Sequence, residues 1–107
     1  MSKSKSSGTR YGKYKADAAR RGFKFTLTKA QFDKLTSQPC KFCGNFSGVG
    51  PDERPYNGVD RVNNNKGYIK DNCVPCCWIC NDQKGIQDED DFLEHIKAIY
   101  EYQKRKK

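Results

Sequence analysis

Two C-x-x-C pairs constrain this chain more than any other feature of its sequence. Cys40 and Cys43 form one pair and Cys77 and Cys80 form a second, with 33 residues between them. A C-x-x-C turn directs two thiolates toward one point, and two such turns complete a tetrahedral zinc shell. The spacing therefore predicts a structural zinc site with four cysteine ligands that joins two distant parts of the sequence.

The six cysteines could instead form three disulfides. Six cysteines in 107 residues is below the roughly 8–10% that is typical of a disulfide scaffold. The N-terminus carries charge but no apolar segment of the kind found in secretory signals. We therefore expect an intracellular chain, cytoplasmic or nuclear and not secreted, in which Cys73 and Cys76 are small buried apolar groups rather than ligands.

A metal fits the size and polarity of the chain. Its 107 residues are 35% hydrophobic and 32% charged, which is enough for one domain with a small core. Domains of this kind usually need a disulfide, a metal or a partner for stability. The sequence contains no run of about 18 apolar residues, so it predicts no contact with a membrane.

Positive charge is concentrated in the N-terminal third. Residues 1–39 contain ten Lys or Arg and two Asp or Glu, so their net charge equals the +8 of the whole chain. Such a segment suits a phosphate-rich partner. Residues 1–9 alone read as a disordered basic tail, for which a solubilising role is the simpler interpretation.

Capping signals and hydrophobic periodicity predict the elements. The predicted helices span residues 10–21, 28–37, 77–84 and 89–104. The predicted strands span residues 23–27, 58–62 and 68–69, and residues 45–57 are predicted to be loop. The expected organisation is therefore a basic helix–strand–helix leader (10–39), a zinc-bound core (40–87) and a C-terminal helix packing on that core (88–107).

Between the cysteine pairs the chain reads as strand, Asn-rich turn, strand and helix. Asp60 and Arg61 lie on the first strand, Asn72 precedes the helix, and Asn81 follows the last cysteine. This pattern, with the C-x-x-C pairs, resembles the zinc-stapled branch of the HNH, or ββα-metal, endonucleases, in the style of phage and mobile-element members. The resemblance covers about residues 10–95 and is compatible with a virus-encoded protein. It implies an α+β fold, a small zinc-stapled, treble-clef-like ββα-metal domain with flanking helices.

Helical spacing supports this resemblance independently. Cys77, Cys80, Asn81 and Lys84 occupy offsets 0, 3, 4 and 7, which lie on one helix face. Zinc would fix the start of that helix, so that Asn81 points beside the first strand, where Asp60 could meet it. A carboxylate and an amide oxygen suit Mg²⁺ or Mn²⁺, which would stabilise charge at a scissile phosphate.

The resemblance assigns catalytic roles to Asp60, Arg61, Asn72 and Asn81. Asn72 is expected to brace the loop between the strands through backbone hydrogen bonds. Arg61 departs from the family pattern, because family members place a general-base histidine there. Since an arginine has a pKa above about 12, Arg61 is expected to clamp the phosphate or stabilise the transition state.

Another group must then accept the proton that the family's histidine would take. Tyr68, Tyr56 or metal-bound hydroxide could replace the histidine, whereas His95, the one histidine of the chain, is expected on a helix surface. Trp78 is expected to cover the metal cluster as a core residue. Tyr11 and Tyr14 either line a groove for the nucleic-acid backbone or pack into the core. The residues predicted to bind substrate are Lys84, Arg10, Lys13, Lys15, Arg20 and Arg21.

These observations predict a divalent-metal-dependent endonuclease that hydrolyses DNA phosphodiester bonds and nicks as a monomer or weak dimer. DNA is the expected partner ahead of RNA. The alternative is a catalytically inactive zinc module that binds nucleic acid, and the arginine at position 61 keeps that alternative open. A third interpretation, a zinc-stapled protein-interaction domain, explains the basic N-terminal third less well.

Overall fold

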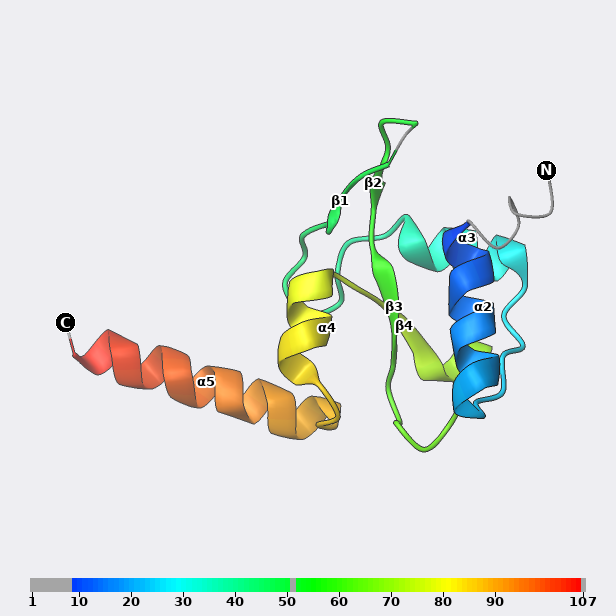
Figure 1. Ribbon diagram of the computed structural model, residues 1–107. Helices are drawn as coiled ribbons and strands as arrows, with labels where there is room; N and C mark the ends of the chain where they lie inside the picture. Colours follow the sequence, from blue (N-terminus) through cyan, green and yellow to red (C-terminus); the bar gives the residue numbers. More distant parts are fainter. Residues whose placement is uncertain (1–8, 51, 107) are drawn as a thin grey trace.

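A computed structural model describes residues 9–50 and 52–106 of the chain (Figure 1). The elements, in chain order, are α2 (Arg10–Arg21), α3 (Lys29–Thr36), β1 (Gly48–Val49), β2 (Pro55–Tyr56), β3 (Gly58–Arg61), the 3₁₀ turn η1 (Lys70–Asn72), β4 (Cys73–Cys76), α4 (Trp78–Lys84) and α5 (Glu89–Arg105). β1 pairs with β2 and β3 pairs with β4, so the predicted α+β class is confirmed. Among the described residues no helix is long and apolar enough to cross a membrane.

Local capping sets the bounds of the first two helices. The hydroxyl of Thr9 accepts a hydrogen bond from the Gly12 N–H at the start of α2, and Gly22 ends this helix with a left-handed φ of 80°. Thr28 and Gln31 form a reciprocal capping box at the start of α3. Both helices match their predicted positions, whereas residues 1–8 of the predicted disordered tail lie outside the described residues.

The main core lies between α2, α3 and the β3–β4 hairpin. Its buried members are Ala18, Leu27, Phe32, Val59, Tyr68 and Cys73. Tyr11 and Tyr14 pack edge-on against Phe32, with ring centroids 5.4 and 5.3 Å apart. Of the two alternatives for the α2 tyrosines, the structure therefore shows the one in which their rings pack into the core.

Strand pairing differs from the prediction in the second half of the hairpin. β3 pairs with β4, which places Asp60 opposite Val74 and Arg61 opposite Cys73. The predicted return strand at residues 68–69 contributes one isolated parallel bridge, between Phe25 and Tyr68. That bridge is also the one pairing of the predicted strand 23–27 among the described residues. Side-chain hydrogen bonds close the 62–72 loop, so the chain returns to β3 only after that loop.

The segment predicted as loop at residues 45–57 contains the short β1–β2 hairpin. A fully buried Asn57 fixes its base. The Asn57 side-chain amide donates to the carbonyls of Gln38 (2.8 Å) and Asn45 (3.0 Å), and its oxygen accepts from the Ser47 N–H (2.8 Å). These bonds join the hairpin to the end of α3 and to the first C-x-x-C turn.

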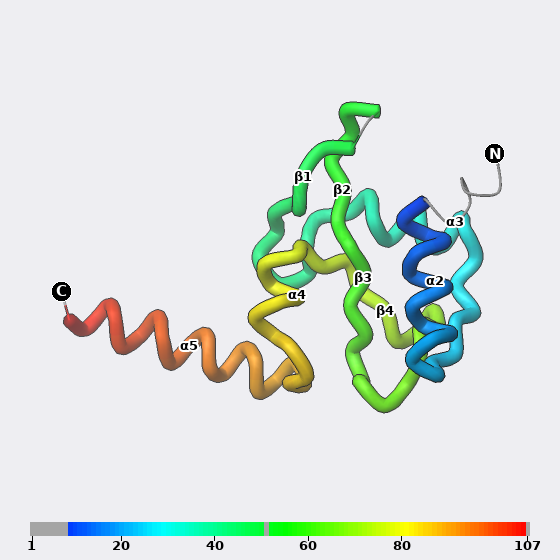
Figure 2. The backbone as a smooth tube through the Cα atoms, in the orientation of Figure 1, coloured from blue at the N-terminus to red at the C-terminus, as the bar shows by residue number. Residues whose placement is uncertain are grey.

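Helix α5 extends away from the rest of the domain (Figures 1 and 2). Phe92 is its one buried residue and packs edge-on against Phe42, with ring centroids 5.3 Å apart. Glu89 also pairs with Lys41 at 2.7 Å. The helix and its apolar face were predicted. The contacts above lie at the start of the helix, whereas Leu93, Ile96 and Ile99 further along it are exposed.

Candidate functional site

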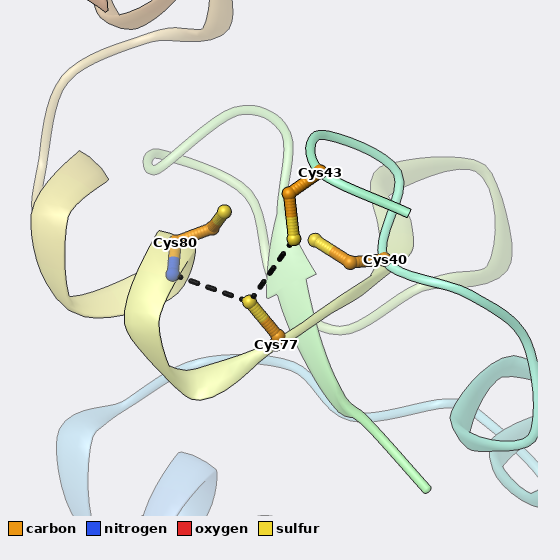
Figure 3. A group of neighbouring side chains, drawn as sticks. All are labelled: Cys40, Cys43, Cys77 and Cys80. Carbon is orange, nitrogen blue, oxygen red and sulfur yellow. Dashed lines mark hydrogen bonds between the residues drawn. The ribbon is translucent and has the colours of Figure 1, made fainter. Parts of the chain in front are cut away.

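Four cysteines converge between the first C-x-x-C turn and the start of α4 (Figure 3). The sulfur atoms of Cys40, Cys43, Cys77 and Cys80 all lie within 4.8 Å of one another. Tetrahedral zinc with Zn–S bonds of about 2.3 Å needs sulfurs about 3.8 Å apart, and the Cys43 and Cys77 sulfurs are 3.6 Å apart. All six cysteines are free thiols. The four predicted ligands are therefore arranged to hold one metal ion, and the disulfide alternative is not observed.

Backbone N–H groups already favour thiolates at this cluster. The Cys77 sulfur caps α4 by accepting from the Cys80 N–H at 3.4 Å, and the Cys40 sulfur accepts from the Phe42 N–H at 3.4 Å. Burial alone would raise the pKa of the Cys40 thiol, but backbone hydrogen bonds lower that pKa to about 6. Since the thiolate is the form that binds metal, the local geometry suits a metal ligand.

Cys73 and Cys76 lie outside this cluster of ligands. Cys73 belongs to the main core, where burial raises its pKa to about 12. Cys76 packs beside Cys40 and Cys77, and burial raises its pKa as well. Both thiols are therefore neutral near pH 7 and act as the small apolar groups expected.

Trp78 lines a surface hollow with Cys43, Cys77 and Cys80, but it is not the core residue that the sequence predicted. Its side chain is 63% exposed, and its backbone N–H donates to the Ser47 hydroxyl at 2.9 Å. Cys77 and Cys80 turn one face of α4 inward. Trp78, one residue or about 100° further around the helix, consequently faces solvent.

A cavity of about 440 Å³ lies beside β3. Asp60 from β3 and Asn81 from α4 both line it, so the structure brings the two predicted cation ligands to one cavity. The cavity is also lined by Lys13, Tyr14, Arg21, Arg61 and Tyr68.

Asp60 and Lys84 form a buried ion pair at this cavity. The Asp60 Oδ2 and Lys84 Nζ atoms are 3.0 Å apart, and Lys84 is fully buried. Burial raises the pKa of the Asp60 carboxyl, and the Lys84 ammonium opposes that rise. Neither of the two paired atoms makes a hydrogen bond to another group in the described part of the chain. The pair thus engages Oδ2 and leaves Oδ1 as the oxygen through which Asp60 can serve the cavity.

Lys84 therefore differs from the solvent-facing phosphate contact that the sequence predicted. It shares the inward helix face of Cys77 and Cys80, so its stem runs into the domain rather than toward solvent. The spacing of Lys84 from Cys77 and Cys80 implied this burial. The signal in the sequence was that this basic residue lies on the helix face that carries the predicted zinc ligands.

Arg61 is held at the wall of the cavity. Its Nη1 atom donates to the carbonyls of Asn64 (2.8 Å) and Lys66 (3.0 Å), and its guanidinium carbon lies 3.8 Å from the Phe23 ring centroid. These contacts use both N–H groups of Nη1. Arg61 therefore shapes the 62–67 turn while it lines the cavity.

Asn72 braces the same turn from within the fold. Its side-chain oxygen accepts from the Asn63 N–H at 2.8 Å, and its amide donates to the carbonyls of Asn63 (3.1 Å) and Gly67 (2.9 Å). Asn72 is buried and does not line the cavity. Its side chain therefore contacts the turn and not the cavity.

The basic residues of α2 divide into two groups. Lys13 and Arg21 line the cavity, whereas Lys15 and Arg20 do not. Arg10 donates to the Asn57 carbonyl and lies over the Tyr56 ring, 4.4 Å from its centroid, so it supports the fold. Of the six residues predicted to bind substrate, the structure brings Lys13 and Arg21 to the cavity.

The candidate proton acceptors are also separated by their positions. Tyr68 lines the cavity, and the Arg21 guanidinium lies beside its hydroxyl. Tyr56 lies in a different surface hollow, and His95 is exposed on α5. Tyr14 also lines the cavity, but burial raises the pKa of its hydroxyl, which accepts from the Val59 N–H at 3.1 Å. Of the three side chains weighed from the sequence, Tyr68 is thus the one that reaches the cavity.

Comparison with known proteins places this geometry in a known fold. No family model matches the chain. Uncharacterized protein R423 of Acanthamoeba polyphaga mimivirus is 39% identical over 96 residues, and the match spans 90% of this chain but 17% of the viral protein. The solved structure of the rare-cutting HNH restriction endonuclease PacI is similar with a TM-score of 0.62 at 22% identity, over 86% of this chain and 75% of that chain. The chain therefore has an HNH-type fold.

Proposed function

Proceeding from this HNH-type fold, we propose that the protein is a divalent-metal-dependent endonuclease that hydrolyses DNA phosphodiester bonds. The observation that carries the proposal is the position of Asp60 and Asn81. They come from β3 and α4, they line one cavity, and α4 begins at the four-cysteine cluster. A structural metal would thus fix the relative position of the two elements that supply the reaction site.

Zinc is the ion we assign to the four cysteines. Four thiolates in a closed tetrahedral shell are the usual ligands of structural zinc, and they leave no open coordination position for chemistry. The distance between the Cys43 and Cys77 sulfurs supports this assignment. Asp60 Oδ1 and the Asn81 amide oxygen would hold a second ion, Mg²⁺ or Mn²⁺, for which few protein ligands and several waters are normal.

When bound, this second ion supplies stabilisation of the charge that develops on the phosphate and the leaving oxygen. The chain's own residues orient the reaction. Lys84 holds Asp60 so that Oδ1 is available to the cavity. Lys13 and Arg21 add positive charge at the cavity wall, where they can contact phosphate oxygens of a DNA strand.

Tyr68 is the residue that we propose accepts a proton from, or orients, the attacking water. Its hydroxyl lies beside Arg21 in the cavity. Arg61 cannot take this role because its guanidinium stays charged. Instead Arg61 holds the turn on which the cavity wall depends. Asp60 and Asn81 lie together at one cavity of the described chain, so we expect a monomer to nick one strand at a time.

Conversion of supercoiled plasmid to open circles tests this function. With Mn²⁺ or Mg²⁺ present, the unaltered chain should nick the plasmid, and Asn81→Ala should lower the rate by roughly 100-fold or more. Asn81 is the better variant because it is exposed, whereas Asp60→Asn also disturbs the buried pair with Lys84. Lys13→Ala should weaken cleavage, and Lys15→Ala, which lies outside the cavity on the same helix, is the matched control.

A nucleic-acid-binding module without activity is the second candidate function. Two observations favour it: the arginine at position 61, and the buried Lys84 ammonium, which balances the charge of the Asp60 carboxylate. A chain that retards DNA with steep salt dependence yet never nicks it with either cation would support this alternative. The same result would overturn the proposed hydrolysis.

A further inference from the structure

Ile86 presents an apolar side chain to solvent at the edge of the cavity, in the loop that joins α4 to α5 (Figure 1). It is 89% exposed, more than any other large hydrophobic residue in the described part of the chain. It lines the cavity together with Asp60 and Asn81. A single exposed isoleucine is common on protein surfaces. What distinguishes Ile86 is its position beside the two proposed cation ligands.

Hydrogen bonds hold the backbone around Ile86. The Gln87 N–H donates to the Lys84 carbonyl at 3.1 Å, which closes the loop onto the end of α4. The Asn64 side-chain amide donates to the Ile86 carbonyl at 2.6 Å, which ties the loop to the 62–67 turn. The apolar side chain is therefore presented from an ordered backbone, so a ligand that binds against it loses little affinity to ordering of the loop.

Charge differs on the two sides of Ile86. The cavity on one side is lined by three basic residues and two acidic ones, of which Asp60 is a proposed cation ligand. Ile86 also lines a second hollow, whose charged lining residues among those described are Asp88, Glu89, Asp90 and Asp91. Phosphate groups are attracted to the first side and repelled from the second. A DNA strand bound at the cavity therefore meets Ile86 with an uncharged part of the strand.

The spacing between Asn81 and Ile86 fits the size of a nucleotide. The Gly85 N–H donates to the Asn81 carbonyl at 3.1 Å, so the chain completes about one helical turn between them. Ile86 consequently lies about 5–6 Å beyond Asn81 along the helix axis. Successive nucleotides of one strand advance about 3.4 Å along a duplex. A phosphate beside Asn81 thus places the sugar and base of its own or the adjacent nucleotide within reach of Ile86.

Resting on the proposed endonuclease function, we propose that Ile86 packs against the sugar and base of a nucleotide at the scissile phosphate. Lys13 and Arg21 can contact phosphates, but phosphate contacts are the same for every polyanion of similar shape. An apolar contact is made only with the nucleoside. Ile86 is therefore a binding residue that distinguishes a nucleic-acid strand from other polyphosphates, and it takes no part in the chemical step.

Fluorescence anisotropy of a labelled DNA duplex of about 20 base pairs, titrated with the zinc-loaded chain without Mg²⁺ or Mn²⁺, measures this contact. Ile86→Ala removes three carbons, whose full burial is worth about 50-fold in affinity, so contact on one side should be worth about 5–10-fold. Ile86→Leu keeps the apolar area and should bind within about 2-fold of the unaltered chain. Ile79→Ala is the matched control, because Ile79 is an exposed isoleucine of α4 that lines a different hollow.

Salt dependence separates an apolar contact from a phosphate contact. Ile86→Ala should leave the slope of log Kd against log salt concentration unchanged, because it removes no charge. Lys13→Ala should lower that slope by about 0.9, as expected for one lost phosphate contact. Inorganic polyphosphate offers charge without sugar or base. In isothermal titration calorimetry, Ile86→Ala and the unaltered chain should therefore bind it equally tightly.

Three results would overturn the inference: Ile86→Ala binding DNA within about 2-fold of the unaltered chain, equal losses toward DNA and polyphosphate, or a lowered salt slope in Ile86→Ala. The last two would mean that the change acts through charge or through the fold. A chain that binds DNA through Ile86 but never nicks plasmid would overturn the proposed hydrolysis alone. A chain that nicks while Ile86→Ala binds normally would overturn the nucleoside contact alone. A chain that binds no DNA at about 0.05 M salt would overturn both.

Discussion

Replacing Lys84 with methionine tests how the chain holds Asp60. The change keeps an unbranched stem of similar length and removes the charge at 3.0 Å from Asp60 Oδ2. At that separation, with an effective dielectric constant of about 20, the attraction is about 5.5 kcal/mol before the cost of removing both charges from water. Because removing one partner of a buried pair usually costs about 3–5 kcal/mol, and Asp60 opens onto a cavity that can admit water, we expect a loss of about 3 kcal/mol.

Urea unfolding followed by far-ultraviolet circular dichroism, in excess zinc, measures this loss. Lys84→Met and Asp60→Asn should each destabilise the fold, and the double variant should lose about 2–3 kcal/mol less than the sum of the single losses. The Lys84→Met deficit should also shrink as the pH falls. Burial already raises the pKa of Asp60, and losing the ammonium raises it further. A group with a raised folded-state pKa favours the folded state at low pH.

Additive single losses, within about 0.5 kcal/mol, would refute this reasoning. They would mean that the two charges do not interact in the folded protein. A Lys84→Met deficit that grows toward low pH would contradict the assigned direction of the Asp60 pKa. Both results would also remove the argument that Lys84 leaves Oδ1 available to the cavity.

Three further outcomes can be checked by the same unfolding assay. Chelation of zinc, or Cys77→Ser, should unfold the domain, because structural zinc contributes about 10–16 kcal/mol; cooperative unfolding of the metal-free chain would disprove this. Tyr14→Phe should cost about 1–3 kcal/mol by leaving a backbone N–H of β3 unpaired. The unaltered chain should lose stability at high pH, because the raised Tyr14 pKa favours the folded state only until the pH rises through that pKa. Tyr14→Phe should not show this loss. Gly67→Ala should cost about 1–3 kcal/mol or more because its Cβ would overlap the Lys24 carbonyl oxygen, whereas Gly48→Ala, with ordinary contacts, should cost less.

Local signals in the sequence were sufficient for the metal cluster and the helices. The C-x-x-C spacing and the caps at Thr28 and Gly22 depend on neighbouring residues, and the structure confirms them. The shared helix face of Cys77, Cys80 and Asn81 placed Asn81 at the cavity for the same reason.

Features that depend on distant side chains were missed. Asn72 closes the 62–72 loop, so the strand that returns to β3 begins later than alternation suggested. Asn57 joins three segments through its side-chain amide, which no local pattern reveals. Lys84 was predicted to be a surface residue, because burial of a lysine is unfavourable without a charged partner. The sequence alone does not show that Asp60 is that partner. The exposed apolar residues of α5, such as Leu93 and Ile96, mark the same limit, since periodicity identifies an apolar face but not what covers it.

Anomalous diffraction from crystals of the zinc-loaded chain soaked in Mn²⁺ gives the most direct test of the proposed site. We predict a zinc peak at the centre of the Cys40, Cys43, Cys77 and Cys80 sulfurs. We also predict a separate manganese peak within bonding distance of Asp60 Oδ1 and the Asn81 amide oxygen. Manganese absent from Asp60 while the Lys84 pair is intact, or sulfurs joined as disulfides, would contradict the proposal.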